Sequence, residues 1–318
     1  MLSNLASPMV LAFVLGIVAS RIKSDLKFPE SLYQTLTIYL LIAIGIKGGY
    51  KLSTTSFAEV AFPAMAALAL CCFIPVWTYG IMRKVAGLDV VNAAALAAHY
   101  GSVSAVTFSA ALVYHESLGI AYEGFMPSIL AIMEIPAILV AIFLARWNQS
   151  ASSERVSFRI LLRELLTGKS TVLLIGFLLI GFAMGKSGWE QVSPLFDTPF
   201  KGILTLFLLE AGLTAGRKLS ELRSGGLTIV GFGTIFPVLH ALLGIYLGNW
   251  AGLSPGGATI LGVLAASASY IAAPAACRVA LPEANPSYYL TAALAITFPF
   301  NIVVGLPLYH QLAEMIIH

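Results

Sequence analysis

The chain has 318 residues, of which 58% are hydrophobic and only 10% are charged. Soluble domains hold about 25% charged residues, so this composition excludes an ordinary soluble domain and favours a membrane protein that crosses the bilayer many times. The net charge of +3 is small. It reflects how Lys and Arg are divided between the two membrane faces, and we expect no nucleic-acid partner.

Apolar segments of membrane-spanning length recur along the whole chain. A transmembrane helix needs roughly 20 mainly apolar residues, and we find ten candidate spans. They lie at about Leu5–Ser20, Ser31–Ile46, Phe57–Met82, Val90–Tyr114, Tyr122–Ala145, Ser170–Gly185, Phe200–Ala215, Leu227–Trp250, Gly257–Val279 and Tyr288–Leu312. We therefore predict an all-α protein with two halves of five helices, residues 1–149 and 170–318, joined by a cytoplasmic linker at residues 150–169.

The distribution of Lys and Arg predicts the orientation of these spans. With the N-terminus outside, fourteen of the 18 Lys and Arg residues fall in inner loops, and the outer side keeps only Lys47, Lys51, Lys186 and Lys201. The positive-inside rule then places both chain ends on the outer face. Because each half has five spans, equivalent segments of the two halves run in opposite directions. We expect an inverted repeat.

The two halves also repeat a sequence pattern. Ala86-Gly87-Leu88 and Gly101-Ser102-Val103-Ser104 recur 165 residues later as Ala251-Gly252-Leu253 and Ala266-Ser267-Ala268-Ser269. A duplication in a very apolar chain, with a small polar cluster in mid-span of each half, is typical of secondary transporters.

Two glycine pairs repeat as well. Gly45 and Gly49 match Gly212 and Gly216 at an offset of 167 residues. Small residues at this spacing allow two helices to approach closely. We expect these glycines to build a scaffold or an oligomer face and not to bind substrate.

The fourth and ninth spans are each predicted to be interrupted by a short polar segment. The segments are Gly101-Ser102-Val103-Ser104 and Ser267-Ala268-Ser269-Tyr270. A helix in lipid breaks only where its freed backbone groups are buried in protein or line a wet cavity. Each break leaves N–H groups at the positive end of a half-helix, which suits a small anion. These eight residues are the candidate substrate site; in the alternative interpretation, the small residues only let helices pack closely.

Polar side chains near the breaks are candidates for a sodium site. Glu134 lies in the fifth span, Asn301 lies 167 residues later in the tenth, and Thr107 follows the first break. A carboxylate at this depth is costly unless it is paired with a cation or protonated, and oxygen ligands suit a sodium ion. The alternative for Glu134 is a protonated structural residue. Glu210 is a weaker candidate because it lies near the inner end of its span.

Other kinds of site have little support in the sequence. The three cysteines form no CxxC motif and have no His at ligand spacing, so we expect no transition metal and no cofactor beyond sodium as a co-substrate. A membrane-embedded enzyme would need a pattern such as HExxH or a Ser/His/Asp constellation, and the sequence offers neither. We therefore expect a protein that is not an enzyme.

Four segments carry a family resemblance. They are Tyr100–Phe108, Ser267–Ala276, Pro282–Ser287 and Phe298–Ile302. Together they resemble the sodium-dependent bicarbonate permeases of cyanobacteria and other bacteria. The resemblance implies ten helices in two inverted repeats with helices four and nine broken, core and gate subdomains that move in an elevator-like way, and a homotrimer.

The same resemblance implies a function. It predicts bicarbonate import driven by sodium across the bacterial cytoplasmic membrane, with bicarbonate at the two breaks and sodium at the nearby polar positions. A PII-like protein controls cyanobacterial relatives from the cytoplasmic face, and the linker is short for such docking. The alternative function is sodium-coupled transport of another small anion, such as a monocarboxylate.

Overall fold

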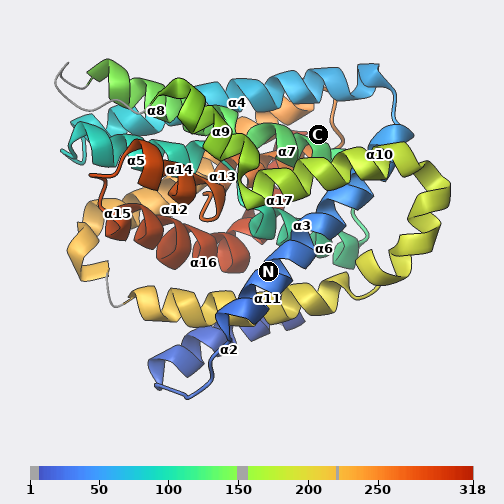
Figure 1. The fold of residues 1–318 in the computed structure, drawn as a ribbon, viewed down its shortest axis with the longest axis horizontal. Helices are drawn as coiled ribbons and strands as arrows, with labels where there is room; N and C mark the ends of the chain where they lie inside the picture. The colour runs from blue at the N-terminus through green and yellow to red at the C-terminus, as the bar shows by residue number, and fades with distance from the viewer. Residues whose placement is uncertain (1–6, 149–156, 220–221, 318) are drawn as a thin grey trace.

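The computed structural model describes residues 7–148, 157–219 and 222–317, which form helices and no strands (Figure 1). Seven helical segments are long and apolar enough to cross a membrane: Glu30–Ser53, Phe57–Lys84, Val90–Ser117, Met126–Asn148, Lys169–Phe196, Thr228–Trp250 and Pro286–Ile316. The prediction of a polytopic helical membrane protein is therefore confirmed, while the count of ten spans stays a prediction. The predicted start of the first span at Leu5, and residues 150–156 of the linker, lie outside the described residues.

The first half of the chain forms seven helices within the described residues. They are α2 (Pro8–Arg21), α3 (Glu30–Ser53), α4 (Phe57–Lys84), α5 (Val90–Gly101), α6 (Ala105–Leu118), α7 (Met126–Met133) and α8 (Pro136–Asn148). Side chains mark several of these starts. The Asp89 carboxylate accepts the N–H groups of Val91 and Asn92, each at 2.9 Å, and so caps α5.

The predicted linker contains a short helix that the sequence did not predict, and the helices of the second half follow it. The elements are α9 (Phe158–Thr167), α10 (Lys169–Phe196), α11 (Phe200–Lys218), α12 (Leu222–Trp250), α13 (Pro255–Ala266), α14 (Ala272–Ala280), α15 (Pro286–Leu290), η2 (Thr291–Thr297), α16 (Phe298–Phe300), η3 (Asn301–Gly305) and α17 (Leu306–Ile316). Helix α9 buries Leu161 and Leu165, so the linker packs against the protein. Helix α10 continues past the predicted end of its span and bends at Gly185, whose φ of 59° suits a residue without a Cβ.

Both predicted breaks are present. Helix α5 ends at Gly101 and α6 begins at Ala105, with extended backbone at Ser102 and Ser104 between them. Helix α13 ends at Ala266, Ser267 is extended, and α14 begins at Ala272.

Two further irregularities lie in the fifth and tenth predicted spans. Helix α7 ends at Met133, and the chain bends before Pro136. A proline disfavours helical backbone at the residue before it, which explains this interruption. In the tenth span the π-helices η2 and η3 flank Pro299, and such bulges are frequent at functional sites.

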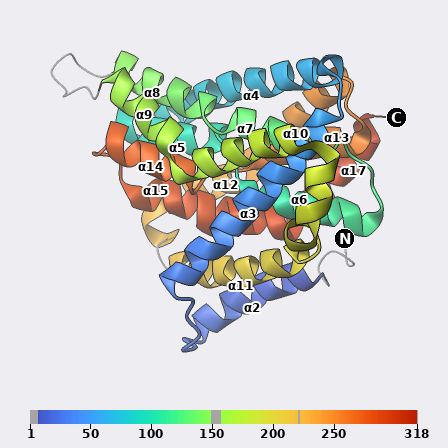
Figure 2. The ribbon, with the colours of Figure 1, turned by 45° about the vertical axis from the view of Figure 1, so that its right-hand side comes forward.

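Four helices pack in two close pairs. Helix α2 lies along α11, and α3 lies along α10, as Figures 1 and 2 show from two directions. The glycines explain the close approach. A Cβ on Gly49 would lie 2.0 Å from the Leu178 carbonyl oxygen of α10, and one on Gly212 would lie 2.1 Å from the Phe13 carbonyl oxygen of α2. The predicted close helix contact at these glycines is confirmed, and we call α2, α3, α10 and α11 the paired helices.

The remaining long helices gather around the breaks. Helix α4 packs on α5 and α8, and α12 packs on α13. The two broken segments also contact each other, α6 against α13 and α14 against α5. We call the helices α4 to α8 and α12 to α17 the central bundle.

We expect Gly49→Ala to destabilise the contact between α3 and α10. Overpacking a tight contact costs about 1–3 kcal/mol, and this methyl would overlap backbone that cannot move aside. Thermal unfolding of the detergent-solubilised protein should occur at a lower temperature. Gly176→Ala on α10 is the matched control, because its methyl would meet no atom within 4 Å. Equal melting temperatures for the two variants would contradict the role given to Gly49.

Candidate functional site

The two breaks meet inside the central bundle. The backbone N–H of Ser104 donates to the Ser267 hydroxyl oxygen at 3.0 Å. The backbone N–H of Ser269 donates to the His99 carbonyl oxygen at 2.8 Å. All four residues are buried, and each bond joins one half of the chain to the other. The structure thus brings the two predicted segments together.

Two of the four serine hydroxyls cap the helices that follow the breaks. The Ser104 oxygen accepts the Thr107 N–H at 3.2 Å and the Thr107 hydroxyl at 3.0 Å. The Ser269 oxygen accepts the Ala273 N–H at 3.2 Å. Ser104 is the N-cap residue of α6, whereas Ser269 lies two residues before Ile271, the N-cap residue of α14. The two serines are equivalent in the sequence repeat, and each accepts an N–H group from the first turn of the helix that follows.

The other two hydroxyls are bonded to backbone carbonyls. Ser102 donates to the Glu134 carbonyl oxygen at 2.8 Å, and Ser267 donates to the Leu264 carbonyl oxygen at 2.8 Å. Neither residue lines the cavity described next. Their positions favour a bracing role for these two hydroxyls.

A small cavity of about 20 Å³ lies at the meeting point of the breaks. It is lined by Leu41, Val103, Ser104, Ala105, Glu134, Ser170, Ser269, Tyr270, Ile271 and Ala272. About 10–15 Å³ of such space holds one water molecule, so the cavity is on the scale of a single small guest. Of the eight predicted substrate residues, Val103, Ser104, Ser269 and Tyr270 line it.

The electrostatics of this cavity come from helix ends. Helix α6 begins at Ala105 and α14 begins at Ala272, and both residues are in the lining. The first N–H groups of a helix have no acceptor within that helix, and they carry its positive partial charge. The lining holds no Lys or Arg, so two helix starts are its main sources of positive potential. Such a cavity favours a weakly charged anion.

Glu134 adds one carboxylate to the same cavity. It lies at the interruption between α7 and α8 and is only 7% exposed. Its Oε2 atom is buried and has no hydrogen-bond partner among the described residues. The carboxyl group has a side-chain hydrogen bond with Ser170, but no Lys or Arg lines the cavity beside it, and a negative charge in this setting is costly. It therefore fits a bound cation or a proton.

The other two predicted sodium ligands lie behind the breaks. Thr107 bonds to Ser104, as described above, and does not line the cavity. The Asn301 side chain donates to the Ala266 carbonyl oxygen at 3.0 Å and accepts the Tyr309 hydroxyl at 2.7 Å. Asn301 therefore fixes the end of α13, so the geometry brings only Glu134 of the three to the cavity.

We expect Asn301→Ala to weaken the binding of both ions that the sequence predicts, sodium and bicarbonate. The change frees the buried Ala266 carbonyl and the Tyr309 hydroxyl, and an unsatisfied buried group costs about 1–3 kcal/mol. The second break would then lose its fixed position. Transport kinetics should show higher half-saturating concentrations of both ions. A change confined to sodium would instead make Asn301 a direct sodium ligand.

The sequence did not predict that Ser170 and Leu41 belong to this site. They come from α10 and α3, which are paired helices, and they close the cavity against the central bundle. A Ser in the first turn of a span gives little signal by itself. Only the packing of distant spans brings it to Glu134.

Gly101 allows close packing at the first break. A Cβ at this position would lie 2.6 Å from Pro75 and 2.8 Å from Ala137. The glycine therefore allows α5 to end against α4 and α8. Ala268 of the second break is buried and does not line the cavity.

These observations define a polytopic helical membrane protein with a small ion-sized site between two broken helices. The sequence model of the Na⁺-dependent bicarbonate transporter superfamily matches residues 8–314, and the chain belongs to this superfamily. The suspected family is thereby confirmed over nearly the whole chain. A comparison with curated proteins finds no match.

Proposed function

We propose that this protein is a sodium-coupled symporter that imports bicarbonate by alternating access. Family membership supports bicarbonate and sodium as the transported ions. The observation that carries the proposal is the cavity at which α6 and α14 both begin, with the Glu134 carboxylate beside them. Bicarbonate is a small monovalent oxyanion that accepts several hydrogen bonds, so helix-start N–H groups suit it without a fixed cation.

A sodium ion beside this cavity suits its electrostatics. Glu134 brings a negative charge close to where the anion would bind, and a cation beside Glu134 would cancel that charge. Anion binding would then depend on sodium, with a coupling free energy of about 1–3 kcal/mol. In this proposal Glu134 is the main sodium ligand, and Thr107 and Asn301 hold the surrounding backbone.

The substrate residues divide into two groups. Val103, Ser104, Ser269 and Tyr270 contact the anion, together with the first backbone N–H groups of α6 and α14. The remaining predicted residues, Gly101, Ser102, Ser267 and Ala268, hold the breaks in position. The hydrogen bonds between the breaks support this division.

An inverted repeat of five and five spans is supported by the helix pairs. In the predicted repeat, α2 corresponds to α10 and α3 corresponds to α11. Replacing each helix of the pair α2–α11 by its counterpart therefore gives the pair α10–α3, and both pairs are present. Most of the cavity lining comes from the central bundle, while Leu41 and Ser170 come from the paired helices. Elevator-like movement of a core (the central bundle) against a gate (the paired helices) would carry the cavity across the membrane.

Location and assembly follow from the same proposal. Ten spans with both chain ends on the outer face agree with the distribution of Lys and Arg, whereas a bacterial cytoplasmic membrane rests on the family resemblance. A homotrimer and a PII-like cytoplasmic regulator are proposals that rest on the family resemblance alone. Cross-linking in native membranes would test the trimer.

Uptake of labelled bicarbonate into proteoliposomes tests the proposed function. Sodium is imposed on the outside only, and an equal potassium gradient serves as the control. We expect accumulation with sodium and none with potassium. Excess acetate or sulfate tests the alternative substrate: competition as strong as that of unlabelled bicarbonate would favour a transporter of another small anion.

A further inference from the structure

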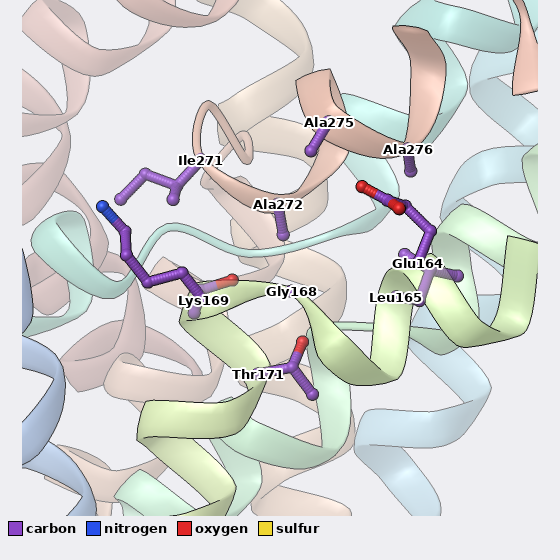
Figure 3. A pocket seen from close by; sticks show the side chains of 10 residues that line it. Glu164, Leu165, Gly168, Lys169, Thr171, Ile271, Ala272, Ala275 and Ala276 are labelled. Carbon is purple, nitrogen blue, oxygen red and sulfur yellow. The ribbon is translucent and has the colours of Figure 1, made fainter. Parts of the chain in front are cut away.

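A second, larger cavity of about 240 Å³ lies beside the small one (Figure 3). It is bounded by the end of α9, the start of α10 and the face of α14. Its lining is Glu164, Leu165, Gly168, Lys169, Ser170, Thr171, Ile271, Ala272, Ala275 and Ala276. Ser170, Ile271 and Ala272 line both cavities, so the two cavities lie next to each other and share a wall.

The charges of this larger cavity are sparse. Lys169 is its one cation and Glu164 its one carboxylate, and both side chains are exposed to solvent. In Figure 3 the Lys169 chain extends toward Ile271, whereas the Glu164 carboxylate lies at the other end, near Ala276. The wall formed by α14 is made of alanines. A passing anion therefore meets one positive side chain, and this side chain lies at the end nearer the break.

Lys169 has a full positive charge, which the small cavity lacks. The lining of the small cavity holds no Lys or Arg, and its Ser and Glu side chains are buried. An anion that moves from the two helix starts into the larger cavity exchanges partial charges for water, and Lys169 is the one Lys or Arg in the lining of that cavity. The predicted orientation puts the start of α10 on the inner side, where Lys and Arg are concentrated.

We propose that this larger cavity is the inner vestibule of the transport path and that Lys169 binds the anion transiently at its neck. This proposal rests on the proposed function, since it takes bicarbonate as the substrate. Lys169 is then a further substrate-contacting residue, which acts at one face of the membrane only. It lowers the concentration of anion needed to fill the site from inside.

Exchange of labelled bicarbonate measured separately at the two faces tests the proposal. Right-side-out and inside-out membrane vesicles carrying the full-length chain expose the outer and the inner face in turn. The variants are Lys169→Gln, Lys169→Arg and Lys186→Gln. Lys186 is the matched control: it is exposed on the same helix, lies 3.9 Å from Glu190 and does not line the vestibule.

Lys169→Gln should raise the half-saturating bicarbonate concentration at the inner face about two- to fivefold, the scale of one exposed charge. Lys169→Arg and Lys186→Gln should behave like the parent, and no variant should change the outer-face value. The effect of Lys169→Gln at the inner face should become smaller at about 1 M ionic strength with sodium held constant, because the Debye length is then about 3 Å. A merely structural role would alter both faces and would not respond to salt.

The outcomes separate this proposal from the proposed function. A parent protein that exchanges no bicarbonate overturns both. A parent that does exchange bicarbonate, with Lys169→Gln unchanged at the inner face or altered equally at both faces, overturns the vestibule proposal alone. An equal change at both faces would mean that Lys169 anchors α10 at the membrane surface.

Discussion

Ser104→Ala and Ser269→Ala are each expected to raise the half-saturating bicarbonate concentration from several-fold to about a hundred-fold. Each change removes a hydroxyl from the cavity lining and also removes the cap of the following helix. Loss of a cap costs about 0.5–2 kcal/mol, and it lets the N–H groups that face the anion move. Initial rates of labelled bicarbonate uptake at saturating sodium measure the effect.

Ser109→Ala provides the control for these variants. Ser109 is a buried serine of α6 whose hydroxyl donates to the Ala105 carbonyl oxygen at 2.8 Å, and it does not line the cavity. We expect this variant to transport like the parent. If Ser104→Ala and Ser269→Ala also match the parent, the anion does not bind between the two helix starts.

Glu134→Gln is expected to weaken the response to sodium more than the response to bicarbonate. Glutamine keeps the shape of the side chain and removes its charge, so a cation loses its main partner. The half-saturating sodium concentration should rise by about 10–150-fold, because an interaction with a charged group contributes about 1.5–3 kcal/mol. Uptake measured over a range of sodium concentrations, at fixed bicarbonate, gives this value.

Glu210→Gln is the matched control for Glu134→Gln. Glu210 is another carboxylate within a predicted span, but its side chain accepts the Thr214 hydroxyl at 2.7 Å and does not line the small cavity. This variant should keep the sodium response of the parent. An unchanged sodium response in Glu134→Gln would remove Glu134 from the sodium site.

The sequence predicted those parts of the site that depend on local residue types. Small polar segments in mid-span located both breaks, and the repeated glycines located the helix contacts, because each feature has a direct backbone consequence. Glu134 was recognisable because a carboxylate inside an apolar span is costly. The repeat offset also matched Ser104 with Ser269, the two residues that cap the second half-helices.

The partners of each polar group could not be predicted in the same way. The bond from Ser102 to the Glu134 carbonyl needs the bend before Pro136, and a proline inside a span does not reveal which carbonyl it frees. Asn301 resembles a sodium ligand by residue type, yet its amide fixes Ala266. Ser170 joins the cavity only through the packing of α10 beside the central bundle, which no local pattern encodes.

Equilibrium binding of labelled sodium to the purified protein, with and without bicarbonate, tests the central claim most directly. If the two ions bind side by side at this site, bicarbonate must tighten sodium binding and sodium must tighten bicarbonate binding by the same factor. We predict a factor of about 5–150 in both directions. Sodium affinity that stays the same at saturating bicarbonate would contradict a shared site for the two ions.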